Sequence, residues 1–320
     1  MESTNLVQLP NPRPRQLEEA VTAFRHRITD SGLFTDESLV RILDGHPSEF
    51  LAVSRMGSDC RKYEWSEGDL TGLGGAELLT AVRKGRLWLN VRKVTRFWPE
   101  LNRLVERLYS ELEQRCPEFR TSRHSANILI SSPKALVYYH LDLPQNILWQ
   151  VRGHKRIWVY PINERTVSSE VLESTLASER LEDLPYDPDT DAMAEVFDLA
   201  SGDVVTWPQN CPHRVENAGD LNISLSTEHY TAAQLRRIRV AQANSAIRKA
   251  TGLTSRSVRT DGLGYAMKYG VLLASRTSQR WIRRRQDHKL IEYPRTFRVN
   301  PSAADGVEPL DAPVAGTVGY

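Results

Sequence analysis

The chain has 320 residues, of which 40% are hydrophobic and 26% are charged, and its net charge is +2. These are the values of an ordinary globular protein, long enough to bury one large core or two modest ones. No apolar run approaches the roughly 18–20 residues that span a bilayer, and the N-terminus lacks the apolar segment of a secretory signal. We therefore expect a cytoplasmic protein with no membrane partner.

The cysteines and the charge distribution narrow the class further. Three widely separated cysteines exclude a disulfide framework and a zinc finger, and fit a reducing compartment: Cys60, Cys116 and Cys211. We interpret the last of them as a small buried residue rather than a ligand. Residues 231–300 contain 16 Lys/Arg and 3 Asp/Glu, whereas residues 164–203 contain 12 acidic and 2 basic side chains. The overall balance does not indicate a nucleic-acid binder.

The N-terminal third is predicted to be helical. Residues 1–15, with three prolines, predict a flexible arm, and residues 16–120 predict a helical region. Thr35 is a typical helix N-cap followed by acidic residues, and Pro99 lies in the first turn of a helix expected over 98–115. Three histidines here lack ligand-like neighbours and are interpreted as structural or exposed: His26, His46 and His124.

Residues 121–230 change to short segments that are rich in β-branched and aromatic residues and are separated by turn residues. An acidic insert over 163–191 divides them. About eight strands are expected, at 127–130, 135–139, 147–151, 156–160, 195–198, 203–207, 213–217 and 222–227. Short strands with tight turns predict a mainly β core, a barrel or jelly roll that closes its own edges, with helical additions at both ends.

The C-terminal region, residues 231–300, is basic and predicted to be helical. Thr231 to Gln234 form a capping-box pattern that opens one helix. A second helix is expected over 265–285, and its apolar run at 271–274 could pair with a second copy in a homodimer. Residues 301–320, rich in Ala, Pro and Gly, predict a flexible tail.

The candidate chemistry lies in the predicted strands. His140 and Asp142 are two residues apart, so on a strand their side chains point to the same side. His213, which follows Pro212 on a distant strand, is the best candidate for a third ligand. Two histidines and one carboxylate leave three open positions on an octahedral ferrous ion, as in non-haem iron oxygenases.

Lys155 and Asn146 indicate an organic acid beside the metal. A 2-oxoacid that chelates iron through its keto and C1 carboxylate groups still has a distal carboxylate to neutralise inside the barrel. A buried Lys155 would pair with it, and Asn146 could hydrogen-bond the same acid. Taken singly, the two residues could equally be a basic turn residue and a strand-edge amide.

With these residues in place, the segments 140–156 and 202–213 resemble the JmjC/cupin-like 2-oxoglutarate oxygenases. The most similar branch is that of the asparaginyl hydroxylase that modifies hypoxia-inducible factor (factor inhibiting HIF). In that branch an asparagine and a lysine follow the metal-binding histidine at the spacing with which Asn146 and Lys155 follow His140.

The resemblance covers about residues 120–230 and implies a double-stranded β-helix of the jelly-roll or cupin-like type. It implies Fe(II) bound by His140, Asp142 and His213, with 2-oxoglutarate and O2 as co-substrates. The implied reaction hydroxylates a C–H bond in an amino-acid side chain of a peptide or protein, or in a small molecule. Succinate and CO2 would be the co-products.

One position departs from the family pattern. The family often has Thr or an aromatic residue three positions before the metal histidine, in contact with the oxoglutarate carboxylate, and this chain has Val137 there. Tyr138, Ser224 or Thr227 could supply the missing hydroxyl. Tyr138 is included among the predicted cofactor-binding residues.

Two other classes of function stay open on the residues alone. A non-catalytic cupin-like module could keep the triad and bind another metal or a small acid, and a demethylase would result if the hydroxylated carbon were bonded to nitrogen. An enzyme acting on nucleic acid would rest only on Arg283 to Arg285. A solvated helix end is the preferred interpretation of these arginines, so we expect no nucleic-acid partner.

Overall fold

The computed structural model describes residues 5–177, 184–252, 257–283 and 294–314, and for residues 274–283 only the course of the backbone. The described helices are α1 (Gln16–Glu19), α2 (Asp36–Gly45), α3 (Gly75–Lys84), α4 (Val94–Phe97), α5 (Pro99–Arg115), α6 (Ser169–Leu176), α7 (Ala232–Thr251) and α8 (Gly262–Arg283). The described strands are β1 (Val7–Gln8), β2 (Thr22–His26), β3 (Leu51–Arg55), β4 (Ser66–Asp69), β5 (Leu87–Val91), β6 (Thr121–Ser131), β7 (Leu136–His140), β8 (Gln145–Val159), β9 (Glu195–Leu199), β10 (Asp203–Thr206), β11 (His213–Thr231), β12 (Arg295–Val299) and β13 (Val307–Val314).

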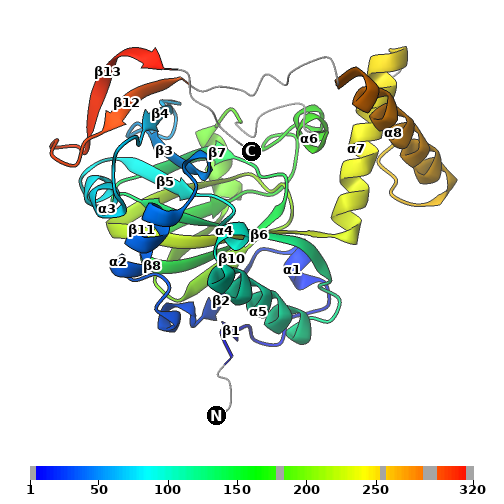
Figure 1. The fold of residues 1–320 in the computed structure, drawn as a ribbon. Coiled ribbons are helices and arrows are strands. Elements are labelled where there is room, and N and C mark those ends of the chain that lie inside the picture. Colours follow the sequence, from blue (N-terminus) through cyan, green and yellow to red (C-terminus); the bar gives the residue numbers. More distant parts are fainter. Residues whose placement is uncertain (1–4, 178–183, 253–256, 284–293, 315–320) are drawn as a thin grey trace.

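The strands form two layers that share the long strands β8 and β11 (Figure 1). What we call the major sheet has the order β1-β2-β10-β8-β11-β6-β5-β3-β4-β12-β13. In what we call the minor sheet, β7 pairs with one half of β11, β11 with β8, and β8 with β9. Two layers joined by strands that run through both are the arrangement of a jelly roll. The prediction of a mainly β, cupin-like core is confirmed.

A glycine lies where β8 passes from one sheet to the other. Gly153 has φ of +76°, and a Cβ atom at this position would lie 2.6 Å from the carbonyl oxygen of Leu221. Only glycine combines this backbone conformation with so close an approach. The segments 147–151 and 156–160, predicted as two strands, are therefore one bent strand, and 213–217 and 222–227 are likewise both parts of β11.

Two apolar cores lie on either side of the major sheet. The outer core packs helices α2, α3 and α5 against residues such as Ile128 and Ile130 of β6. The inner core lies between the two sheets and contains Leu148, Ile157 and Val205. A fully buried side chain of this size contributes about 1.5–3 kcal/mol to stability. Both cores therefore hold the shared strands in place.

The predicted helix starts are confirmed. The hydroxyl of Thr35 accepts a hydrogen bond from the backbone N–H of Ser38 at 3.2 Å, and α5 begins at Pro99. At the start of α7, Thr231 and Gln234 form both hydrogen bonds of a capping box. Local side-chain chemistry fixes these ends, which is why they are readable in the sequence.

The predictions for the two ends of the chain were wrong in part. Val7, assigned to the flexible arm, is fully buried in β1 and pairs with His26 of β2. The region expected to be helical from 16 to 120 also contains β2, β3, β4 and β5. Residues 307–314, assigned to the flexible tail, form β13, which pairs with β12, and β12 runs parallel to β4. These strands form because they pair with strands far away in the sequence. No local sequence pattern predicts them.

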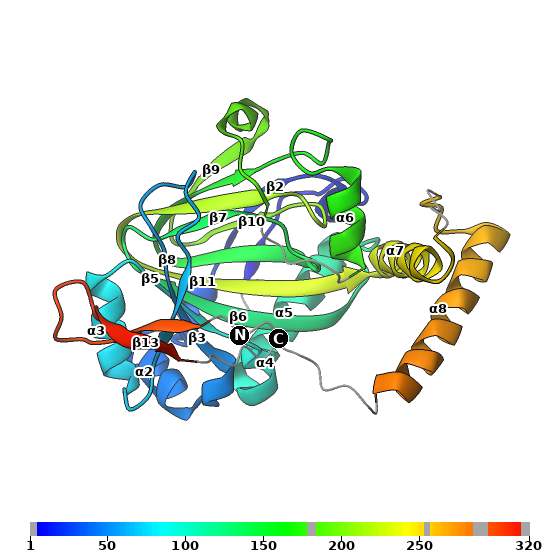
Figure 2. The ribbon, with the colours of Figure 1, turned by 90° about the horizontal axis from the view of Figure 1, so that it is seen from above.

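Helices α7 and α8 lie beside the sheets rather than on them. Figure 2 shows α7 leading away from the end of β11 and α8 farther out still. None of the described helices is long and apolar enough to cross a membrane. Of the predicted basic cluster Arg283 to Arg285, Arg284 and Arg285 lie outside the described residues, and of Arg283 only the backbone is described.

Candidate metal centre

Three predicted ligands meet at one end of the minor sheet. His140 is the last residue of β7, and His213 is the first residue of β11 and its cross-strand partner. Asp142 follows two residues after His140. One ligand atom from each of these three side chains lies within 4.8 Å of the other two. The structure thus brings together the residues that the sequence separates by more than seventy positions.

Backbone contacts turn both imidazole rings toward the carboxylate. The Nδ1–H of His140 donates to the carbonyl oxygen of Tyr138 at 2.7 Å, and that of His213 donates to the carbonyl of Cys211 at 3.1 Å. The two Nε2 atoms lie 3.9 and 3.3 Å from oxygens of Asp142. Two ligands at right angles, each about 2.1 Å from one ion, are about 3 Å apart, so these spacings fit a metal ion. Such contacts fix the tautomer that a metal needs.

The protonation states also suit a metal. Burial lowers the pKa of His140 to about 4, and the neighbouring His213 adds to this effect. Burial alone would raise the pKa of Asp142, but its neighbours His213, His140 and Asn146 hold that pKa below its usual range. A neutral imidazole beside an ionised carboxylate is the form in which these side chains bind metals.

Three amides fix the segment that carries Asp142. Asn210 Nδ2 donates to the carbonyl oxygen of Asp142 at 2.6 Å, and Gln209 Nε2 donates to that of Leu143 at 2.8 Å. Asn146 Nδ2 donates to the Asp142 side chain. The loop before His213 is thereby joined to the loop after His140. Sequence analysis missed Gln209 and Asn210, because an amide in a loop carries no pattern of its own.

Lys155 lies on the inner face of the minor sheet. It is two residues from Ile157, which belongs to the inner core, and its side chain is 5% exposed. Among the described residues its Nζ has no hydrogen-bond or ion-pair partner, and burial lowers the pKa of its amine to about 7. A buried amine without an anion is costly. The position therefore suits a ligand that brings its own carboxylate.

The candidate hydroxyls near Val137 have different surroundings. Val137 is the cross-strand partner of Val215 and packs against the inner core. The hydroxyl of Tyr138 accepts hydrogen bonds from the backbone N–H groups of Gly57 and Glu64. The other two are occupied within the sheet: Ser224 donates to Gln150, and Thr227 accepts from Trp149. A cofactor contact by Tyr138 stays a prediction.

A further carboxylate that sequence analysis missed lies near the triad. Glu228 of β11 is the cross-strand partner of Asn146, which holds Asp142. Burial raises the pKa of Glu228 to about 7, and the charge of Asp142 adds to the shift. Only the strand register, which is a long-range property, places Glu228 near the metal ligands.

The comparisons with known proteins agree with this architecture. Residues 84–231 match the family model of the cupin-like domain. The matched stretch is just under half of the chain and contains all three candidate ligands. No curated protein matches the sequence.

Several solved structures are similar to this chain. The ribosomal oxygenase YcfD of Escherichia coli has 17% identity and a TM-score of 0.46, over 90% of this chain and 75% of that one. YcfD in complex with cobalt and 2-oxoglutarate has 18% identity and a TM-score of 0.48 over the same shares. A cupin superfamily protein of Desulfitobacterium hafniense has 10% identity and a TM-score of 0.23, over 35% of this chain and 72% of that one. The function has to be argued from the site itself.

Proposed function

We propose that this chain is an Fe(II)- and 2-oxoglutarate-dependent dioxygenase that hydroxylates a C–H bond of its substrate. One observation carries the proposal. Two imidazoles whose Nδ1 atoms are already hydrogen-bonded direct Nε2 toward one carboxylate. On the same inner wall lies a buried lysine that has no anion among the described residues. A triad of this composition suits ferrous iron and leaves ligand positions open.

Each residue has a distinct role in this proposal. His140, Asp142 and His213 would hold the metal on one face, and Asn146 would keep the carboxylate of Asp142 oriented. Lys155 would bind the distal carboxylate of 2-oxoglutarate. Its Cα lies four residues, or about 13 Å, along β8 from the neighbour of His213. The lysine side chain and a five-carbon diacid together bridge this distance.

The chemistry that bound Fe(II), 2-oxoglutarate and O2 supply is oxidative decarboxylation to succinate and CO2, coupled to insertion of oxygen into a C–H bond. The chain's part is to bind, orient and exclude water. Apolar residues of the inner core, such as Ile157 and Val205, line the space between the sheets. The amino-acid side chain of a peptide or protein is the proposed substrate, as in the asparaginyl hydroxylase branch.

Anaerobic spectroscopy tests the proposal. Fe(II) and 2-oxoglutarate added together should give a visible metal-to-ligand charge-transfer band, which requires both components. His140→Ala should remove the band, because one of the three ligands is lost. His154→Ala is the matched control, since His154 is an exposed histidine on β8 next to Lys155. No band in the unaltered protein, or an undiminished band in His140→Ala, would refute the assignment.

A turnover measurement separates an enzyme from a binding module. With O2 present, the unaltered protein should form succinate from 2-oxoglutarate, slowly even without a substrate. A charge-transfer band without any succinate would identify a module that binds the co-substrate but does not turn over. Either result is read by mass spectrometry of the reaction mixture.

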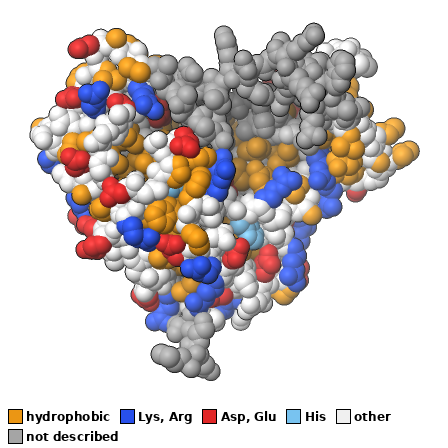
Figure 3. Space-filling view, in the orientation of Figure 1, with side chains coloured by type: hydrophobic (Ala, Val, Ile, Leu, Met, Phe, Trp, Pro, Cys, Tyr) orange, Lys and Arg blue, Asp and Glu red, His pale blue; other side chains and the backbone are white. Residues whose placement is uncertain are grey.

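We further propose that α8 forms a homodimer with a second copy. Leu263, Met267 and Val271 recur every fourth residue and are 78%, 61% and 39% exposed, and hydrophobic side chains gather at the edge of the molecule over α8 (Figure 3). Such a stripe is typical of a helix pairing surface. Light scattering should show a dimer that Met267→Glu converts to a monomer. An unaltered protein that is monomeric at micromolar concentration would contradict this.

A further inference from the structure

The inner wall of the major sheet carries polar side chains beside the candidate metal centre. On β11, Leu225 and Thr227 face away from the inner core, so the alternating residues Ser226 and Glu228 face the space between the sheets. Glu228 is directly opposite Asn146 on β8. Cβ atoms of such cross-strand pairs are about 4.5–5.5 Å apart. Glu228 is therefore one strand away from the residue that holds Asp142.

The carboxylate of Glu228 lacks a cation among the described residues. Its Oε1 accepts a hydrogen bond from Asn127 Nδ2 at 2.9 Å, and the described residues offer it no ion-pair partner. Lys93 acts on it only through space, while the backbone N–H of Lys93 donates to Asn127 Oδ1. Burial and the charge of Asp142 raise the pKa of Glu228, and a cation bound beside the carboxylate would lower it. Glu228 is half-buried and not sealed in the core.

The buried amides around Asp142 present acceptors as well. Asn146, Gln209 and Asn210 use their N–H groups on the segment of Asp142, which fixes the orientation of each amide. Their side-chain oxygens are buried and have no hydrogen-bond partner among the residues that the structure describes. An unsatisfied buried acceptor costs about 1–3 kcal/mol. A ligand rich in N–H donors would satisfy such groups, whereas a ligand with acceptors only would not.

We propose that Glu228 determines substrate specificity by binding the guanidinium or ammonium end of a basic side chain, with the free oxygen of Asn146 accepting from the same group. Such a contact would hold the carbons of a basic side chain beside the metal. Arginine offers five N–H donors and lysine three, and neither has an acceptor, so both match this wall. The inference rests on the proposed function, because it concerns the substrate of that site.

Small probes test this without any knowledge of the peptide sequence. In protein loaded with Mn(II) and 2-oxoglutarate, n-propylguanidinium and n-butylammonium should bind near the metal and show paramagnetic relaxation of their methylene protons. Their neutral counterparts, n-propylurea and n-butanol, should show about tenfold less. Equal relaxation of the cationic and the neutral probes in the unaltered protein would by itself overturn the proposal.

Glu228→Gln should reduce the relaxation of the cations to the level of the neutral probes. Glu216→Gln is the matched control, because Glu216 lies on the same strand but pairs with Arg214 on the outer face of the minor sheet. Cations that still bind near the metal in Glu228→Gln would refute the role of Glu228. If Mn(II) itself fails to bind, which the relaxation of water protons reports, the proposed function fails and this inference fails with it.

Activity gives a second readout. With a digest of cellular protein as substrate, products that gain one oxygen atom should carry it on arginine or lysine. Glu228→Gln should lower the rate of this reaction at least about thirtyfold, while succinate formation without substrate changes less than about twofold. Products oxidised on neutral residues would overturn the assignment but leave the dioxygenase intact.

Discussion

Two basic side chains of the minor sheet are equally buried but have opposite surroundings. Arg214 of β11 is 4% exposed and Lys155 of β8 is 5% exposed. The register places them on opposite faces: Arg214 pairs with Trp158 on the outer face, and Lys155 is two residues from Ile157 on the inner face. Within the described part of the chain, Arg214 is surrounded by acceptors, whereas Lys155 has none.

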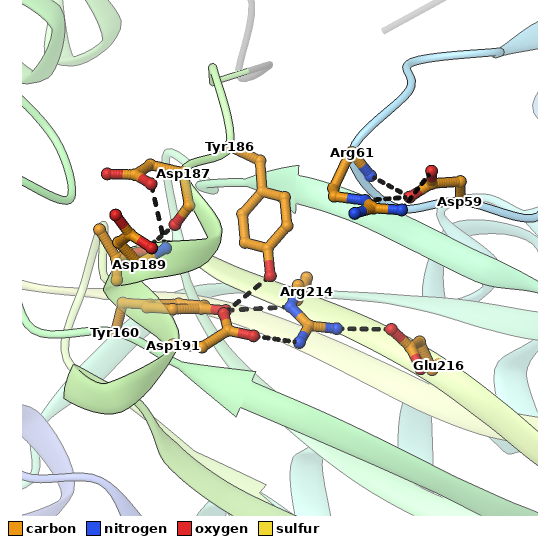
Figure 4. A network of polar contacts seen from close by, with 10 residues as sticks. Asp59, Arg61, Tyr160, Tyr186, Asp187, Asp189, Asp191, Arg214 and Glu216 are labelled. Atoms are coloured by element: carbon orange, nitrogen blue, oxygen red, sulfur yellow. Dashed lines mark hydrogen bonds and ion pairs between the residues drawn. The ribbon is translucent and has the colours of Figure 1, made fainter.

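Acceptors around Arg214 neutralise its buried charge (Figure 4). Its guanidinium forms ion pairs with Asp191 at 2.9 Å and Glu216 at 2.6 Å, and its Nε–H donates to the hydroxyl of Tyr160 at 3.0 Å. It also stacks on Trp158, with its Cζ 3.5 Å from the ring centroid. These contacts outweigh burial and raise the pKa of Arg214. The network fastens the segment before β9 to the outer face.

Lys155 has the surroundings of a binding residue. Its pKa falls because no group in the described part of the chain replaces the water that burial removes. A structural cation is stabilised by the fold, as Arg214 is, whereas a ligand-binding cation is left for the ligand to neutralise. The contrast supports the proposal that Lys155 binds a ligand, and it does so independently of any motif.

The largest loss of stability is expected for Arg214. Arg214→Met should lower the free energy of unfolding by about 2–3 kcal/mol, because Asp191 and Glu216 lose their cation. The value lies below that of a fully buried pair, since both carboxylates reach solvent. Denaturant unfolding measures the change, and titration with 2-oxoglutarate should give an unchanged affinity. A tenfold loss of affinity for 2-oxoglutarate would contradict the claim that the cation on the outer face is structural and the one on the inner face binds the ligand.

In the ligand-free protein, replacing Lys155 should stabilise the fold, whereas replacing Arg214 should destabilise it. Its pKa is about 7 in the folded state, against 10.5 without burial. Between these pH values the unfolded chain binds more protons at this side chain, so the free energy of unfolding should rise as the pH rises from 7 to 10.5. Below pH 7 both states are protonated and the effect levels off.

Lys155→Met should lack this rise and should be more stable than the unaltered protein at pH 7, by on the order of a few kcal/mol. Thermal unfolding at several pH values provides the comparison. The difference in unfolding free energy between the two proteins reports on Lys155, because the other groups that titrate in this range are the same in both. Parallel curves for the two proteins would mean that Lys155 already has an anion.

The smallest effect is expected for a third cation of the same sheet. Arg156 forms a two-pronged ion pair with Asp198 on the outer face, with distances of 2.6 and 2.7 Å, but its side chain is 52% exposed. Solvent screens such a pair. Arg156→Met should leave both the unfolding free energy and the 2-oxoglutarate affinity nearly unchanged. A loss as large as that of Arg214→Met would show that burial is not what separates these cations.

Local chemistry accounts for most of what could be predicted from the sequence. The caps at Thr35 and Thr231 depend on neighbours within a few residues, and His140 and Asp142 are readable because a strand places alternate residues on one side. His213 was found by its turn and proline. The contact of Asn146 with Asp142 differs from the predicted contact with the organic acid, although the two are compatible.

Long-range register accounts for what was missed. β8 and β11 were each divided in two, because nothing near Gly153 shows that a bent strand continues in another sheet. β13 is a strand only because β12 pairs with it and with β4. Glu228 becomes a candidate only once the register places it opposite Asn146.

The most direct test of the central claim is a thermodynamic cycle on Lys155 and the distal carboxylate. In the Zn(II)-loaded protein, 2-oxoglutarate should bind at least about 100-fold more tightly than 2-oxopentanoate, which lacks that carboxylate. Lys155→Met should bind the two acids with nearly equal affinity, whereas Lys134→Met, which alters an exposed lysine, should keep the preference. A preference that persists in Lys155→Met, or none in the unaltered protein, would contradict the account.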